Sequence, residues 1–127
     1  MTQTIATLQL DETVAFDHAT LAAFCAVDGE MAEARITRVL TEIEALIALV
    51  AQQRDHPDGL ARSCHDLARL SGSIGMTTIR NAAAGVLDCL GRDDATGTAA
   101  CRARLVRLGE PRRPGGWAMG RTPDTVA

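Results

Sequence analysis

The chain has 127 residues, enough for one small domain, and 46% of them are apolar, mainly Ala, Leu, Ile and Val. A formal net charge of −3 and an aromatic content of 2% argue against a nucleic-acid-binding protein, which needs basic tracks and stacking surfaces. The longest apolar runs, residues 21–27 and 45–51, are far too short to span a membrane.

The start of the chain and the cysteines indicate a cytoplasmic protein. No signal peptide is recognisable in the first residues, MTQTIATLQLDE, because they lack a basic start followed by an apolar stretch. No Cys-x-x-Cys pair occurs among the cysteines, so we expect them to be reduced and mostly buried. They are Cys25, Cys64, Cys89 and Cys101. The sequence also predicts no metal site, since the inward Glu-x-x-His pairs of di-iron bundles are missing.

Helical periodicity recurs along the chain, whereas no strand pattern of period two persists. A short helix is expected over about residues 17–26. Asp28 is a suitable cap for a long second helix that ends near Gln53. The wide apolar face of this second helix consists of Met31, Ile36, Val39, Leu40, Ile43, Leu46, Ile47 and Val50.

Three further helices follow a linker at residues 54–59. Pro57 suits a first helical position, and the helix that follows it should close near Gly75. The next helix, about residues 76–90, is expected to bury Ile79, Ala82, Ala83, Val86 and Leu90. Gly91 is a candidate left-handed cap for its end.

The last predicted helix begins at Asp93 or Asp94 and stops at Gly109. Its buried residues are expected to be Ala99, Cys101, Leu105 and Leu108. Long amphipathic helices joined by short loops predict an all-α protein, an up-and-down antiparallel four-helix bundle with a short extra N-terminal helix. The expected divisions are an N-terminal segment (1–14), the bundle domain (15–110) and a Pro/Gly/Arg tail (111–127) that is disordered. We expect Trp117 in this tail to be exposed.

The most informative residue of the sequence is His65. A buried stripe at helical spacing is predicted for Leu60, Cys64, Leu67, Ser71 and Ile74. At about 100° per residue, His65 lies roughly 140° from the centre of this stripe, so its ring should point to solvent. His18 and His56 have no comparable surroundings.

The helical neighbours of His65 are either small or cationic. The small ones, Ala61, Ala68 and Gly72, clear a surface on which a partner could dock. Arg62 and Arg69 bring guanidinium groups near the ring. An exposed imidazole in this setting suits a reversible phosphate acceptor.

The residues around His65 resemble the histidine-containing phosphotransfer (HPt) domain family. In that family a leucine follows the histidine by two residues, small residues follow by seven and eight, and an aliphatic residue and a glycine by nine and ten. A second aliphatic residue follows by fourteen. The matching residues here are His65, Leu67, Gly72, Ser73, Ile74, Gly75 and Ile79. The resemblance extends over about residues 15–109 and includes the turn at Asp28–Glu30.

Two positions depart from the family pattern. The family usually has lysine three residues after the histidine, to support the phosphoryl oxygens, and glycine at four, to leave room beside the ring. Ala68 and Arg69 occupy these positions here. Arg69 could supply the missing charge with help from Arg62, because a guanidinium group holds phosphate oxygens in a fork.

The resemblance implies a two-component phosphorelay. His65 would accept a phosphoryl group from a receiver-domain aspartyl phosphate and pass it to another receiver, with Arg62 and Arg69 supporting the phosphate. The chain would be a carrier and not a self-contained enzyme, since it has no ATP-binding motif. It would need no cofactor of its own, because magnesium would come with the receiver. The implied partners are receiver domains and a hybrid sensor histidine kinase. This chain is expected to bind them as a monomer.

Two alternatives remain open from the sequence. The first is a helical docking module that binds a receiver or a sensor kinase without carrying phosphate. The second, less favoured, is the dimerising phosphotransfer domain of a sensor kinase, since no ATP-binding domain follows the bundle.

Overall fold

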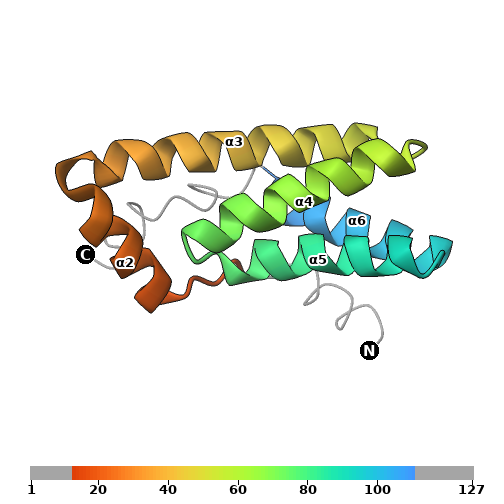
Figure 1. The fold of residues 1–127 in the computed structure, drawn as a ribbon. Helices are drawn as coiled ribbons and strands as arrows, with labels where there is room; N and C mark the ends of the chain where they lie inside the picture. The colour runs from red at the N-terminus through yellow and green to blue at the C-terminus, as the bar shows by residue number, and fades with distance from the viewer. Residues whose placement is uncertain (1–12, 111–127) are drawn as a thin grey trace, which may run out of the picture.

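The structure, a computed structural model, describes residues 13–110, and every regular element in this range is helical (Figure 1). The elements are α2 (His18–Asp28), a 3₁₀ turn η1 (Gly29–Met31), α3 (Ala32–Gln52), α4 (Pro57–Ser73), α5 (Thr77–Gly91) and α6 (Ala95–Leu108). The all-helical prediction is confirmed for the described residues. The predicted tail and Trp117 lie outside them.

Helices α3 to α6 pack around one core. In Figure 1, α4 lies in front between α3 and α5, and α6 lies behind. Because α4 contacts α3 and α5 on its two flanks, its outward face is framed by those helices. The core residues are Ile43, Ile47, Val50, Leu60, Cys64, Leu67, Ile74, Met76, Ile79, Ala82, Ala83, Val86, Leu105 and Leu108.

The segment that precedes α2 packs against the turn between α4 and α5. Phe16 bridges Met76 in an antiparallel manner, and the backbone amide of Asp17 donates to the carbonyl of Gly75 at 2.6 Å. Gly75 has a φ of +78°, and a Cβ there would lie 2.6 Å from the Asp17 carbonyl oxygen. Only glycine fits this close approach, which fixes where α4 ends.

Helices α5 and α6 approach closely through two glycines. A Cβ on Gly97 would lie 2.8 Å from the Cys89 sulfur, and one on Gly85 would lie 3.3 Å from the Cys101 sulfur. Cys89 therefore fills the space beside Gly97 of the facing helix, and Cys101 fills the space beside Gly85. All four cysteines are free, with Cys64 and Cys89 buried and the others half-buried. Burial raises the pKa of the Cys64 thiol to about 12, as expected for an inert core residue.

Several predicted helix ends are wrong. Asp28 does not cap α3, because it ends α2 and its carboxylate lies 3.3 Å from Arg35. Gly91 is still helical, and the left-handed conformation falls on Asp93 at φ 55°. By contrast, the His65 helix ends at Ser73, which confirms the prediction that it closes near Gly75. The predictions for Pro57 as the first helical residue and Asp94 as an N-cap are confirmed.

Two predicted core residues are exposed. Met31 is 61% exposed, because it belongs to the 3₁₀ turn that precedes the long helix. Ala99 is exposed because the first half of α6 borders a hollow. Leu90 is only half-buried, and Cys89 takes its place in the core. Within residues 13–110, none of the helices has the length and apolar character needed to cross a membrane.

Candidate functional site

His65 lies in the middle of α4 and is exposed. The opposite side of this helix is buried, including all five residues of the predicted stripe: Leu60, Cys64, Leu67, Ser71 and Ile74. Ser71 buries its hydroxyl by donating to the Leu67 carbonyl at 2.5 Å. The core therefore holds α4 from behind, and the imidazole projects from a rigid helix toward solvent.

The small residues lie on the α5 side of His65. Gly72 faces α5, because the Arg80 side chain of that helix lies 3.4 Å from where a Cβ on Gly72 would be. Ala68 and Ala61 continue the same face at helical spacing. All three are half-buried, so they form a low, apolar surface beside the ring. This is the predicted docking surface, and the structure brings its three residues together.

The cationic residues lie on the other side of His65, toward α3. Arg62 and Arg69 are both exposed. A guanidinium nitrogen of Arg69 lies 3.7 Å from a carboxylate oxygen of Asp66, and the Arg69 side chain is 70% exposed. Such an exposed pair contributes only about 0–1 kcal/mol. Arg69 can therefore leave Asp66 for a stronger anion at little cost.

A groove between α3 and α4 runs beside Arg69. Its volume is about 290 Å³, and Asp66, Arg69 and Leu70 of α4 form one wall. Glu42, Ala45, Leu46 and Leu49 of α3 form the other. Leu49 is 44% exposed, so part of its aliphatic side chain is available to a partner. The face around His65 is thus apolar on the α5 side, whereas on the α3 side charged residues stand next to the ring and aliphatic residues of the groove lie beyond them.

Sequence reasoning missed this α3 flank. The apolar face predicted for α3 includes Leu46 and omits Ala45 and Leu49, the two residues that extend it toward α4. The available signal was the width of the apolar run at residues 45–51, which exceeds what one buried stripe requires. We treat Ala45, Leu46, Leu49 and Leu70 as a further part of the site.

The remaining candidate ligands lie apart from His65. His18 begins α2 and His56 precedes α4, and both are exposed. Among residues 13–110 there is no group of three or more His, Cys, Asp or Glu side chains arranged to hold a metal ion. The chemistry that this face offers is therefore that of one imidazole with neighbouring guanidinium groups.

Comparison with protein-family models, curated proteins and solved structures found no match for this chain.

Proposed function

We propose that this protein carries a phosphoryl group on His65 in a two-component phosphorelay. The observation that supports this most directly is the exposure of His65 at the centre of α4, opposite a fully buried stripe. In this proposal the domain is an up-and-down antiparallel four-helix bundle formed by α3 to α6, with α2 as the extra N-terminal helix. The resemblance of the His65 helix to HPt domains points to the same function.

The transfer step needs a nucleophile and a leaving carboxylate. An unprotonated ring nitrogen of His65 attacks the phosphorus of a receiver aspartyl phosphate. A nitrogen–phosphorus bond forms, the bond between phosphorus and the aspartate oxygen breaks, and the aspartate leaves as a carboxylate. Imidazole suits this role because it loses its proton near neutral pH. Since the transition state is loose, positioning and charge stabilisation contribute most of the catalysis.

Arg62 and Arg69 are the phosphate-supporting residues in this proposal. Both stand on the same side of α4, one turn before and one turn after His65. After Arg69 leaves Asp66, its guanidinium group can hold two phosphoryl oxygens. These arginines take the role of the lysine that HPt domains usually carry at the position of Ala68.

The partner proposed for this face is a receiver domain, which in turn exchanges phosphate with a hybrid sensor kinase. The half-buried Ala61, Ala68 and Gly72 let the receiver bring its aspartate close to the ring. The apolar groove beside Leu49 gives the interface a second contact area. Such an interface is small and transient, with an apolar centre. We propose a cytoplasmic monomer, with the receiver supplying the magnesium ion.

A second candidate is a docking module that binds the receiver and carries no phosphate. It is favoured by the ion pair between Arg69 and Asp66, which leaves the free protein with one of its two cations engaged. The absence of lysine at Ala68 agrees with it. The two functions share the interface and differ only in whether His65 reacts.

A labelling experiment separates these functions. Purified receiver domains are phosphorylated with ³²P-labelled acetyl phosphate and mixed with the full chain. We expect a label that is labile in acid and stable in base, that His65→Ala abolishes and that His56→Ala retains. His65 is exposed, so its replacement should change stability by no more than about 0.5 kcal/mol. If receivers bind but never label the chain, the carrier function is wrong and the docking module stands.

The roles of the arginines have their own measurement. Arg69→Gln and Arg62→Gln should each slow transfer roughly 10- to 100-fold, because a charged hydrogen bond contributes about 1.5–3 kcal/mol. Arg38→Gln, an exposed change on α3, is the matched control. Rapid-quench labelling measures the transfer rates. If both arginine variants transfer phosphate as fast as Arg38→Gln, these two arginines do not support the phosphate.

A further inference from the structure

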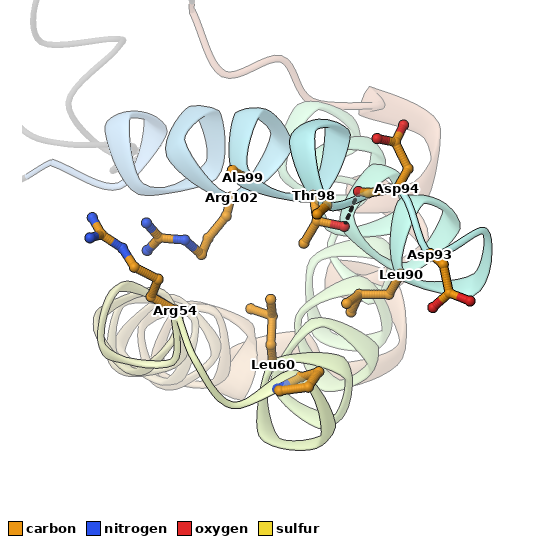
Figure 2. Close-up of a pocket in the computed structure, with 10 residues that line it drawn as sticks. Arg54, Leu60, Leu90, Asp93, Asp94, Thr98, Ala99 and Arg102 are labelled. Atoms are coloured by element: carbon orange, nitrogen blue, oxygen red, sulfur yellow. Dashed lines mark hydrogen bonds between the residues drawn. The ribbon is translucent and has the colours of Figure 1, made fainter.

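A hollow of about 410 Å³ opens at the end of the domain where α4 begins (Figure 2). Its volume lies in the range of small-molecule pockets. The residues that line it come from the α3–α4 loop, the first turn of α4, the end of α5, the α5–α6 loop and α6. They are Arg54, Pro57, Leu60, Leu90, Asp93, Asp94, Ala95, Thr98, Ala99 and Arg102.

One end of the hollow is cationic. Figure 2 shows Arg54 and Arg102 together at this end, on the loop before α4 and on α6. Arg102 is held in place by a hydrogen bond from its guanidinium group to the Ala51 carbonyl at 3.3 Å. Among residues 13–110, no carboxylate forms a salt bridge with either arginine. Two guanidinium groups without a carboxylate partner at one pocket end favour an anion.

The middle of the hollow is apolar. Leu60 forms part of its wall and is only 2% exposed, so its inner side belongs to the core. Leu90 and Ala99 lie between the arginine end and the opposite end in Figure 2. Thr98 also lines this section, and its hydroxyl already donates to the Asp94 carbonyl at 2.8 Å. An aliphatic or aromatic body suits this section, because most of the wall is aliphatic.

Asp93 and Asp94 line the opposite end, and their exposed carboxylates project outward from its rim (Figure 2). The side chain of Asp94 accepts a hydrogen bond from the Gly97 amide at 2.8 Å and caps α6, so it is fixed in position. A ligand with a second anionic group would bring that group toward these two carboxylates. The pocket therefore discriminates against dicarboxylates.

We propose that this pocket binds a small amphipathic monocarboxylate. The carboxylate of the ligand lies between Arg54 and Arg102, and its apolar body lies against Leu60, Leu90 and Ala99. The distal end, neutral in such a ligand, lies near Asp93 and Asp94. The pocket differs from the candidate phosphotransfer site, since Leu60 belongs to the buried side of α4 and His65 to the exposed side. The proposal does not rest on the phosphorelay function.

An NMR titration of the ¹⁵N-labelled full chain tests the proposal. Hexanoate should give saturable shifts at the amides of Leu60, Ala99 and Arg102 and leave that of His65 unchanged. Adipate, which has a carboxylate at each end, and hexan-1-ol, which has none, should each bind roughly tenfold more weakly. The proposal is overturned if hexanoate gives no saturable shifts at the pocket, or if hexan-1-ol binds as tightly.

Variants locate the binding groups. Arg54→Gln and Arg102→Gln should each weaken hexanoate binding roughly tenfold, whereas Arg38→Gln should have no effect. Ala99→Leu fills the hollow from an exposed position on a helix, so it should abolish binding in a folded protein. Unaltered spectra elsewhere in the chain verify folding in each variant. Hexanoate binding that is unchanged in both arginine variants, or that survives Ala99→Leu, contradicts the proposed orientation and site.

Discussion

Helices α4 and α6 have similar lengths and similar apolar spacing, yet they contribute to the core very differently. All five residues predicted for the buried stripe of α4 are buried. Of the four predicted for α6, Leu105 and Leu108 are buried, Cys101 is half-buried and Ala99 is exposed. The difference arises because α4 is flanked by α3 and α5, whereas the first half of α6 borders the hollow.

The two candidate sites of this small domain arise from different degrees of packing. A well-packed helix such as α4 can hold one reactive side chain rigidly on its outer face. An incompletely packed end, such as that between α4 and the start of α6, leaves a cavity that a ligand can enter. The candidate phosphate-transfer site depends on the first property, and the proposed carboxylate site on the second.

Truncation of the core should show the largest contrast between the two regions. Leu67→Ala in the packed centre of α4 should lower the free energy of unfolding by about 3–5 kcal/mol, as it removes buried methyl groups and leaves a cavity. Leu60→Ala should cost less, about 2–3 kcal/mol, because Leu60 already adjoins the hollow, so less new cavity is created. Urea unfolding monitored by circular dichroism measures both changes.

Equal losses of unfolding free energy in Leu67→Ala and Leu60→Ala would contradict the proposed difference in packing. They would mean that the side chains around Leu60, beside the hollow, are packed as densely as those around Leu67. The slope of the unfolding transition serves as the control, since a change in slope indicates that one variant no longer unfolds in two states.

A pair of glycines provides the next contrast. Gly75→Ala should destabilise the protein by about 2–3 kcal/mol, because residue 75 has a positive φ and its Cβ would lie against the Asp17 carbonyl. Gly91→Ala should instead stabilise it by about 0.5–1 kcal/mol, because Gly91 is helical and has open space around it. Thermal unfolding compares the two variants, and the same sign for both would refute the assigned conformations.

The sequence predicted most of what apolar spacing can encode. It located the helices, the buried stripe of α4 and the exposure of His65, because large aliphatic residues at regular intervals define a buried face unambiguously. It failed for Ala99, since alanine is small enough to be tolerated on either face of a helix. The hollow is formed by residues of three helices and two loops, and such a cavity has no local sequence signature.

The sequence was less informative about turns and charges. Asp28 and Asp94 have the same capping chemistry, but only Asp94 caps, because the 3₁₀ turn at residues 29–31 separates Asp28 from α3. The ion pair of Arg69 with Asp66 was also missed, since the direction taken by a long exposed side chain depends on neighbouring helices. Roles for His65, Arg62 and Arg69 remain predictions from pattern and placement.

The two aspartates allow a direct test of capping. Asp94→Ala removes the acceptor for the Gly97 amide and should cost about 1 kcal/mol of stability. Asp28→Ala removes only the ion pair with Arg35, in which the Asp28 side chain is 19% exposed, so it should cost less than Asp94→Ala. Urea titrations in low and high salt distinguish the two effects, because salt screens the ion pair and leaves the cap unaffected. A larger loss for Asp28→Ala would reverse the assignment of the caps.

The smallest expected effect is the acid dependence contributed by Asp17, which caps α2. A hydrogen bond from the Thr20 hydroxyl, followed by one from the Ala19 amide, lowers the pKa of Asp17 below its ordinary value of 3.8. Because the folded-state pKa is depressed, this stabilisation is present above about pH 4 and is lost as the pH falls through the folded pKa. The stability advantage of the native protein over Asp17→Asn should therefore shrink as the pH falls below about 4.

Thr20→Val identifies the cause of this dependence. It removes the largest contribution while the Ala19 amide still donates, so the pKa of Asp17 should rise toward its ordinary value in an NMR titration. The acid limb of the stability curve should then flatten in the same variant, since linkage ties that slope to the difference in bound protons. An unchanged titration of Asp17 in Thr20→Val would show that the amide alone holds the carboxylate. The cap of α2 would then resemble that of α6, where the backbone amide of Gly97 donates to Asp94.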